Sequence, residues 1–398
     1  MKSARLAIIW ATGVAIFSMF FGSGNVVFPL QLGKVTGDWV WMGALGLMVT
    51  AIGAPIMGLL GAVLFEGDCK AFFFRMGKIP GYLAVLLIIG LIGPFGVMPR
   101  CFVVSYSAVQ PYFPDLSLLV FSVISGILTL IFIAKRHFIL PILGCFLSPL
   151  LLVSLVVIIG VGLGSLPHVT ATEFSGWEAF RQGFFTGYDT MDLLASIFFA
   201  VSIWMLLKEQ LNIETESQIR SKLIPTYIWS SLLAGLLLGL IYLGLCVATA
   251  WHSDLVQQVQ PEALLATLAI KLLGSKLAII ANIAIALACF TTVMALAVAT
   301  VDVIHVEFEN SKIAAKLGYH YNWMVLIVVA ITVALSNLGF KTIMIFLHSV
   351  MVVCYPAIIV LTLCNILYKL YNFQWVKTPV FLTLILTLAY YSKPWIGI

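Results

Sequence analysis

The sequence predicts an all-α polytopic membrane protein, and three observations support this fold class. Apolar residues make up 62% of the 398 residues and charged residues only 9%, against about 45–50% and about 25% in soluble domains. The apolar residues fall in runs of about 20 or more, the length that a helix needs to cross about 30 Å of hydrocarbon. The connections between the runs are short, so we expect one membrane domain over residues 1–398 and no separate soluble part.

Eleven apolar runs are expected to cross the membrane, and a twelfth is possible because the long run 342–368 contains Pro356. The runs are 6–30, 39–65, 80–108, 116–134, 138–164, 188–206, 223–250, 276–304, 323–338, 342–368 and 376–392. If five runs repeat after five, the first repeat covers about 6–164 and the second about 188–368. The run 376–392 is then an additional C-terminal helix.

The first run is interrupted by the stretch FFGSGNVVFP at 21–30. Gly22, Gly24, Asn25 and Pro29 disfavour a helix interior. A helix break in hydrocarbon exposes backbone groups that each cost several kcal/mol unless they line a polar cavity or are buried in protein. Carbonyls before such a break can bind a cation, and N–H groups after it can bind a carboxylate. A simple kink or a glycine packing patch is the alternative.

Two other runs carry residues that indicate helix packing rather than chemistry. Small residues recur along the second run, which is typical of closely packed membrane helices. They are Gly43, Gly46, Gly53, Ala54, Gly58, Gly61 and Ala62. In the tenth run, His348 stands alone among apolar residues and is expected to be a polar packing residue.

The third run contains a charge, Arg100, in the stretch GPFGVMPRCFVVSYS at 93–107. A charge at that depth costs at least a few kcal/mol unless it is paired, hydrated or able to reach the interface. Arg100 is therefore expected either to meet a carboxylate inside the bundle or to extend to the outer headgroups.

The sixth run opens with GFFTGYDTMD at 183–192, which carries two glycines and the acids Asp189 and Asp192. Interrupted helices at matching places in two halves of a chain point to a transporter binding site. We therefore expect the sixth helix to be broken like the first. The alternative is that 183–190 is an extracellular loop and that the helix begins at Met191.

The eighth run contains LACFTTVMALA at 287–297, in which Ala288, Thr291 and Thr292 share one helical face. One carbonyl and two hydroxyl oxygens are hard ligands suited to a small cation. Threonine in a membrane helix also bonds to its own backbone or joins neighbouring helices. Spacing alone leaves both interpretations open.

Charge and motif content set further limits on function. More loop lysines and arginines fall on the inner side when the N-terminus is cytoplasmic, which predicts that orientation.

The composition and the motifs do not indicate other classes of function. The net charge of +5 gives no indication of nucleic-acid binding, and the seven cysteines lack paired or metal-ligand spacing. No HExxH or GxSxG motif is present, so an enzyme is not expected. No cofactor and no obligate protein partner are predicted. A passive channel or a solute sensor would share such a site without coupled flux.

Four motifs together resemble the bacterial branched-chain amino acid:cation symporters. They are FGSGNVVFPLQLG, GPFGVMPRCFVVSY, GYDTMDLLAS and LACFTTVMALA, in this order within residues 21–297. The resemblance implies the fold of the amino acid–polyamine–cation superfamily, in which two inverted five-helix repeats surround broken first and sixth helices. It implies import of leucine, isoleucine or valine with Na⁺ across the bacterial cytoplasmic (inner) membrane. The partners would be an amino acid, a cation and membrane lipid.

The resemblance also implies two sets of binding residues. The substrate would be bound by Gly22, Ser23, Gly24, Asn25, Tyr188 and Met191. The Na⁺ ion would be bound by the backbone carbonyls of Ser18 and Phe21 just before the break, and by Ala288, Thr291 and Thr292. Ser107 stands where the family commonly has an acid, and this difference favours Na⁺ over H⁺ as the coupling ion. Coupling to H⁺ through Asp189 or Asp192, and a broader apolar range that includes methionine, are the alternatives.

Overall fold

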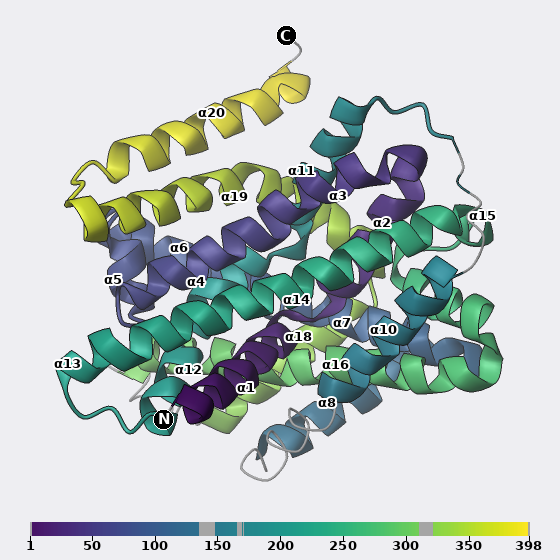
Figure 1. Ribbon diagram of the computed structural model, residues 1–398, viewed down its shortest axis with the longest axis horizontal. Helices are drawn as coiled ribbons and strands as arrows, with labels where there is room; N and C mark the ends of the chain where they lie inside the picture. Colours follow the sequence, from purple (N-terminus) through teal and green to yellow (C-terminus); the bar gives the residue numbers. More distant parts are fainter. Residues whose placement is uncertain (1, 135–147, 165–168, 170, 310–320, 397–398) are drawn as a thin grey trace.

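The computed structural model describes residues 2–134, 148–164, 169, 171–309 and 321–396 (Figure 1). The α-helices are α1 (Lys2–Phe20), α2 (Ser23–Thr36), α3 (Val40–Met48), α4 (Ala54–Val63), α5 (Cys69–Phe74), α6 (Lys78–Ile92), α7 (Val97–Val109), α8 (Leu118–Ala134), α10 (Ser148–Gly164), α11 (Gly176–Thr190), α12 (Asp192–Gln210), α13 (Glu216–Gln218), α14 (Ile224–Trp251), α15 (Ser253–Val256), α16 (Leu264–Glu309), α18 (Tyr321–Ser336), α19 (Phe340–Tyr371) and α20 (Lys377–Ile396). Short 3₁₀ or π segments are Gly37–Trp39, Val49–Gly53, Gln110–Tyr112, Ile219–Leu223 and Pro261–Ala263. The described residues contain no strand, so the all-α fold class is confirmed.

Every predicted apolar run contains helix in the described part of the chain. Five spans there are long and apolar enough to cross a bilayer, and α11 with α12 makes a sixth, broken span. Four shorter apolar helices accompany them, Arg5–Phe20, Leu118–Ala134, Pro149–Gly164 and Tyr321–Ser336. The part of the fifth run at 138–147 lies outside the described residues. Helix α19 continues through Pro356, so the run 342–368 is one helix and not two.

The contacts between helices repeat from one half of the chain to the other (Figure 1). Helix α1 packs on α14, as α11 packs on α3, and α2 packs on α14, as α12 packs on α4. Helix α10 packs on α16, as α19 packs on α7, and α1 meets α10 as α11 meets α19. If each of the five membrane segments of the first half is replaced by the segment at the same position in the second half, each of these contacts becomes its counterpart. Five is an odd number of crossings, so the second half begins on the opposite side and the two repeats are inverted.

The predicted break in the first helix is confirmed. Helix α1 ends at Phe20 and α2 begins at Ser23. Gly22 between them is extended, with φ −116° and ψ −159°. The last N–H before the gap, that of Phe21, still bonds to the Phe17 carbonyl at 2.9 Å. The helical ladder therefore stops at the glycine-rich stretch, where the propensity for helix is lowest.

The sixth helix is also broken, but its start and its break differ from the expectation. Residues 183–190 are helical within α11, so the loop interpretation is wrong, and the helix begins at Gly176 rather than at 188. Ser175 starts it with a capping box, in which the Ser175 hydroxyl accepts from the Glu178 N–H at 3.3 Å. The break lies at Met191, in the left-handed region with φ 65°, where α12 departs at 42°.

Glycines bring α3 and α11 into backbone contact, which confirms the packing role predicted for Gly43 and Gly46. A Cβ on Gly46 would overlap the Phe180 carbonyl oxygen, and a Cβ on Gly183 would overlap the Gly43 carbonyl oxygen. Only hydrogen fits at these two positions. The glycines of the sixth run therefore serve helix packing, while the break itself falls one residue after α11 ends.

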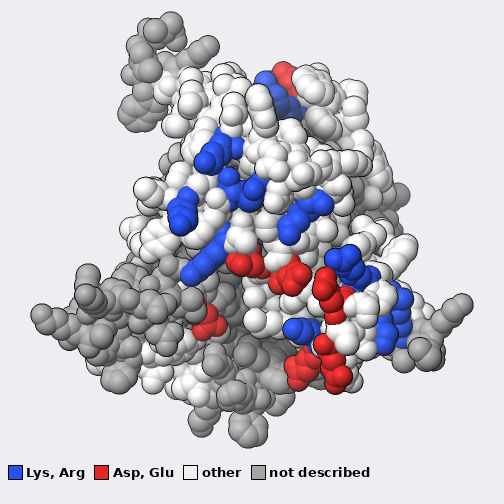
Figure 2. All heavy atoms as spheres, turned by 90° about the vertical axis from the view of Figure 1, so that its left-hand side faces the viewer, with Lys and Arg blue, Asp and Glu red and all other residues white. Residues whose placement is uncertain are grey.

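Basic side chains gather with fewer acids on one end of the molecule (Figure 2). This is the left-hand end of Figure 1, where α5, α13 and the N-terminus lie. Lys70 lies in α5, and Arg220 and Lys222 directly follow α13. Connections that are far apart in sequence thus place their cations at a common end.

Candidate functional site

The two helix breaks adjoin a small cavity. Its volume of about 20 Å³ is enough for roughly one water molecule. The polar part of its lining is formed by Gly22, Ser23, Gly24, Asn25, Arg100, Thr190, Asp192 and Thr292. The apolar part is formed by Met19, Phe20, Ile92, Val97, Met191, Ala195, Phe199 and Leu296. The cavity therefore combines one cation, one carboxyl group and a set of apolar side chains.

The first turn of α2 provides hydrogen-bond donors to this cavity. Ser23, Gly24 and Asn25 are the first helical residues, so their N–H groups precede the helical ladder. The Asn25 Oδ1 accepts from the Gly22 N–H at 3.1 Å, which fixes the turn at the break. The N-terminal end of a helix carries a partial positive charge. This end is suited to a carboxylate.

A buried polar network joins three helices beside the cavity. Asn25 of α2 donates from Nδ2 to Asp192 Oδ2 of α12 at 2.8 Å, and it also donates to the Tyr242 hydroxyl of α14. The Tyr242 hydroxyl donates to the same Asp192 Oδ2 at 3.1 Å. All three side chains are buried. The network fixes the Asp192 carboxyl group at the start of α12.

Arg100 is 1% exposed and bridges both breaks from α7. Its Nε donates to the Ser23 Oγ at 3.1 Å. Nη1 donates to the Asp189 carbonyl at 2.7 Å, and Nη2 donates to the Thr190 carbonyl at 3.0 Å. These carbonyls form the negative end of α11, where a cation is stabilised. Among the described residues its hydrogen bonds reach no carboxylate, and its burial rules out the headgroups, so both expected destinations are wrong.

Gly24 is required by the position of Arg100. A Cβ on Gly24 would lie 2.7 Å from the Arg100 Nη2 and 3.1 Å from the Thr190 carbonyl oxygen. The glycine therefore lets the guanidinium group enter between α2 and α11. This steric role explains one of the glycines that interrupt the first run.

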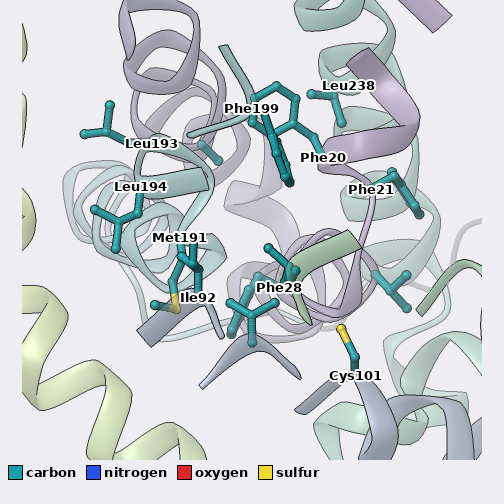
Figure 3. Close-up of a cluster of buried hydrophobic side chains, with 14 of the residues drawn as sticks. Phe20, Phe21, Phe28, Ile92, Cys101, Met191, Leu193, Leu194, Phe199 and Leu238 are labelled. Atoms are coloured by element: carbon teal, nitrogen blue, oxygen red, sulfur yellow. The ribbon is translucent and has the colours of Figure 1, made fainter. Parts of the chain in front are cut away.

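Apolar side chains from both broken helices line the cavity, and Figure 3 shows some of them within a cluster of buried hydrophobic residues. Phe20 and Phe199 meet edge to face with ring centroids 5.7 Å apart, and Met191 and Ile92 line the same cavity. Tyr188, a predicted wall, is not among the lining residues and instead stacks on Tyr355 with centroids 4.5 Å apart. Of the predicted substrate residues, the structure brings the four of the first helix and Met191 to the cavity.

The predicted cation residues are brought together only in part. Thr292 lines the cavity beside Gly22, and the hydroxyls of Thr291 and Thr292 both donate to the Ala288 carbonyl, at 2.8 and 3.0 Å. The Ser18 hydroxyl donates to the Val14 carbonyl of its own helix at 2.9 Å. The Phe21 N–H keeps α1 helical up to the break. A cation site at these residues stays a prediction.

His348 is not a lone packing residue, so this expectation is wrong. Its Nδ1 lies 2.9 and 3.1 Å from the two carboxylate oxygens of Asp189. The pair joins α19 to the end of α11. Its two members are 159 residues apart, and no local pattern in the sequence signals their contact.

Sequence reasoning missed Tyr242 altogether. The signal that could have found it is a phenol within the otherwise apolar run LLLGLIYLGL, because a buried tyrosine hydroxyl usually finds a hydrogen-bond partner. Asp192 was recognised as an unusual acid, but its contacts with Asn25 and Tyr242 depend on packing between helices.

Sequence comparison places the chain among transport proteins. The family model described as "Branched-chain amino acid transport protein" matches residues 6–394. A putative branched-chain amino acid carrier protein of Staphylococcus epidermidis is 28% identical over 89% of this chain and 80% of its own length. The branched-chain amino acid permeases BrnQ of Bacillus subtilis and Escherichia coli are 26% and 27% identical, over 93% and 90% of this chain and 83% and 80% of their own lengths.

Solved structures show the same fold at low sequence identity. The inward-facing conformation of Mhp1 aligns with a TM-score of 0.66 at 13% identity, covering 91% of this chain and 76% of that chain. A closed conformation of Mhp1, a nucleobase-cation-symport-1 family transporter, aligns with a TM-score of 0.60 at 14% identity, covering 97% and 93%. The broken helices and the repeated contacts agree with this architecture. The chain is a carrier, not an enzyme, and it belongs to the branched-chain amino acid transport protein family.

Proposed function

We propose that the protein is a secondary active symporter that imports leucine, isoleucine and valine with Na⁺ across the bacterial cytoplasmic membrane. The observation that carries this proposal is the cavity at the two breaks, where a helix N-terminus and a buried carboxyl group adjoin apolar side chains. These groups match the charged and the aliphatic parts of such an amino acid. The relatives named as branched-chain amino acid carriers and permeases support the same substrate class.

Transport requires this cavity to widen. A volume of about 20 Å³ holds no leucine, so the substrate enters a more open arrangement. Helices α1, α2, α4, α12 and α14 contact one another and carry both breaks. Movement of this group relative to α7 and α16 opens the cavity to one side at a time, with the breaks as pivots.

Sodium coupling is proposed from the position of Thr292. Its hydroxyl oxygen lies near the break, and the Ala288 carbonyl supplies a second oxygen on the same helix face. Both are hard ligands suited to Na⁺. Binding of the ion between α16 and the end of α1 would stabilise the arrangement that binds substrate, so each ligand would raise the affinity for the other.

Coupling to H⁺ is the second candidate, and Asp192 is the observation that favours it. A carboxyl group in the wall of a buried cavity can carry a proton across a membrane.

The orientation of the protein in the membrane is proposed from the charges. The basic end shared by α5, α13 and the N-terminus would face the cytoplasm.

The direct test is uptake of labelled leucine into proteoliposomes with an inward Na⁺ gradient, a proton gradient or no gradient. We expect accumulation with the Na⁺ gradient, and we expect valine and isoleucine to compete. Competition by methionine and phenylalanine measures the breadth of the apolar range. Accumulation with protons alone would replace Na⁺ by H⁺, and equilibration without accumulation would contradict a symporter.

Replacing Thr291 and Thr292 together by valine is expected to weaken the Na⁺ dependence of uptake. The change keeps the shape of both side chains and removes both hydroxyl oxygens. We expect the Na⁺ concentration for half-maximal uptake to rise at least about tenfold, which corresponds to about 1.4 kcal/mol. Thr300→Val is the matched control, because Thr300 lies in the same helix and its buried hydroxyl has no hydrogen-bond partner among the described residues. Unchanged Na⁺ dependence in the double variant would contradict the assignment.

A further inference from the structure

The cavity has one cationic and one anionic side chain in its lining, Arg100 and Asp192. They come from different helices, α7 and α12. An amino acid near neutral pH is a zwitterion, with one positive and one negative group close together. A cavity with one group of each sign is complementary to such a molecule.

Arg100 occupies the backbone acceptors that a broken sixth helix would otherwise offer to an ammonium group. The carbonyls of Asp189 and Thr190 at the end of α11 accept from Nη1 and Nη2. A substrate ammonium group at this place would meet a guanidinium group of the same sign. The group that binds the substrate ammonium must therefore lie elsewhere in the lining of the cavity. Asp192 is the remaining strong hydrogen-bond acceptor in that lining.

The two charged groups approach α2 from different sides. Ser23 contacts Arg100, and Asn25 contacts Asp192. Two residues along an α-helix turn the side-chain direction by about 200°. Arg100 and Asp192 thus flank the first turn of α2, whose N–H groups stand between them. A carboxylate at this turn lies on the side of the guanidinium group, and the attached ammonium group can turn toward Asp192.

Asp192 keeps acceptor capacity for a ligand. Two donors that fix it, Asn25 Nδ2 and the Tyr242 hydroxyl, contact the same oxygen, Oδ2. An ionised carboxylate has about four acceptor sites on its two oxygens. These neutral donors orient the group, and among the described residues no cationic side chain forms an ion pair with it, so a ligand ammonium group could take that place.

We propose that Asp192 receives the α-ammonium group of the substrate while Arg100 and the first turn of α2 receive its carboxylate. Asp192 is then the specificity-determining residue that makes the site select α-amino acids over the corresponding carboxylic acids. This inference rests on the proposed import of branched-chain amino acids and names the residue that recognises their amino group.

The test measures competition against labelled leucine on purified protein in nanodiscs, with three probes. The probes are leucine, isocaproate (leucine without its amino group) and isopentylamine (leucine without its carboxyl group). In the wild-type protein, we expect leucine to bind at least about 100-fold more tightly than isocaproate, because isocaproate brings no cation to balance the buried carboxylate. Isopentylamine is expected to bind comparably weakly, because it lacks the group that Arg100 and α2 bind.

Asp192→Asn is the decisive variant. It keeps the size of the side chain and removes its charge. We expect leucine affinity to fall about 100-fold, while isocaproate affinity stays the same or rises, so the preference for leucine falls below about tenfold. Tyr242→Phe is the matched variant that removes a contact of Asp192 and keeps the carboxylate. It is expected to retain the preference for leucine.

Each other outcome overturns the inference. Equal loss of leucine and isocaproate in Asp192→Asn would show that Asp192 only supports the fold. Unchanged leucine binding in nanodiscs with loss of gradient-driven accumulation in proteoliposomes would show that it carries a coupling proton instead. If Asp192→Asn does not yield folded protein, Asp192→Glu decides, because it keeps the charge and must keep the preference for leucine over isocaproate.

The wild-type protein separates failure of this inference from failure of the proposed function. Wild-type protein that binds leucine without preferring it to isocaproate refutes this inference alone. Wild-type protein that binds no branched-chain amino acid refutes the proposed function as well.

Discussion

Arg100→Met is expected to reduce leucine uptake by about 100-fold or more. The substitution removes three hydrogen bonds from a charged donor, each worth about 1.5–3 kcal/mol. It leaves the Asp189 and Thr190 carbonyls and the Ser23 hydroxyl without their buried partner. The end of α11 then loses its hydrogen bonds to α7, and the cavity loses its cation. Uptake and the midpoint of thermal unfolding are measured together.

Two further variants separate the causes of this loss. Arg100→Lys keeps the charge, but one ammonium group cannot reproduce the fork that reaches three oxygens, so we expect uptake to remain at least about tenfold reduced. Arg220→Met is the control for the same chemical exchange. Arg220 is 79% exposed and its ion pair with Glu216 is a surface contact, which contributes little. Uptake by Arg100→Met at more than half of the wild-type rate would refute the role of Arg100.

Gly183→Ala is expected to destabilise the protein by about 3 kcal/mol, at the upper end of the usual cost of overpacking. The new Cβ would overlap the Gly43 carbonyl oxygen and lie 3.0 Å from the Leu47 N atom. Backbone atoms cannot rotate away as a flexible side chain does, so α3 and α11 must separate. Membrane helices associate largely through such close packing. The thermal unfolding midpoint in detergent and the yield of monodisperse protein measure the effect.

Gly160→Ala is the control for this change. Gly160 lies in α10, and a Cβ there meets no atom of the described residues within 4 Å. Alanine also has the higher helix propensity, by up to about 1 kcal/mol. We therefore expect unchanged or slightly raised stability. Equal stability of Gly183→Ala and Gly160→Ala would contradict backbone contact between α3 and α11.

Local sequence features predicted the fold well, because membrane helices follow from hydropathy along the chain. The length of the apolar runs gave the helices, and the glycines with Asn25 gave the break after Phe20. The sixth helix was harder. Its break lies at Met191, a residue with no intrinsic preference for the left-handed region, and its start at Gly176 follows a capping signal at Ser175 and Glu178 that hydropathy does not detect.

The sequence by itself therefore determined an all-helical membrane carrier of a recognisable family with a broken first helix, since each of these properties depends on neighbouring residues. Only the tertiary structure decided which polar groups meet. Arg100 contacts Ser23 across 77 residues, and Asn25 contacts Asp192 across 167. The first contact lies within one repeat and the second joins the two, and both depend on how the helices rotate and pack against one another. Hydropathy sets the depth of a residue in the membrane, but the direction in which its side chain points follows from that packing alone.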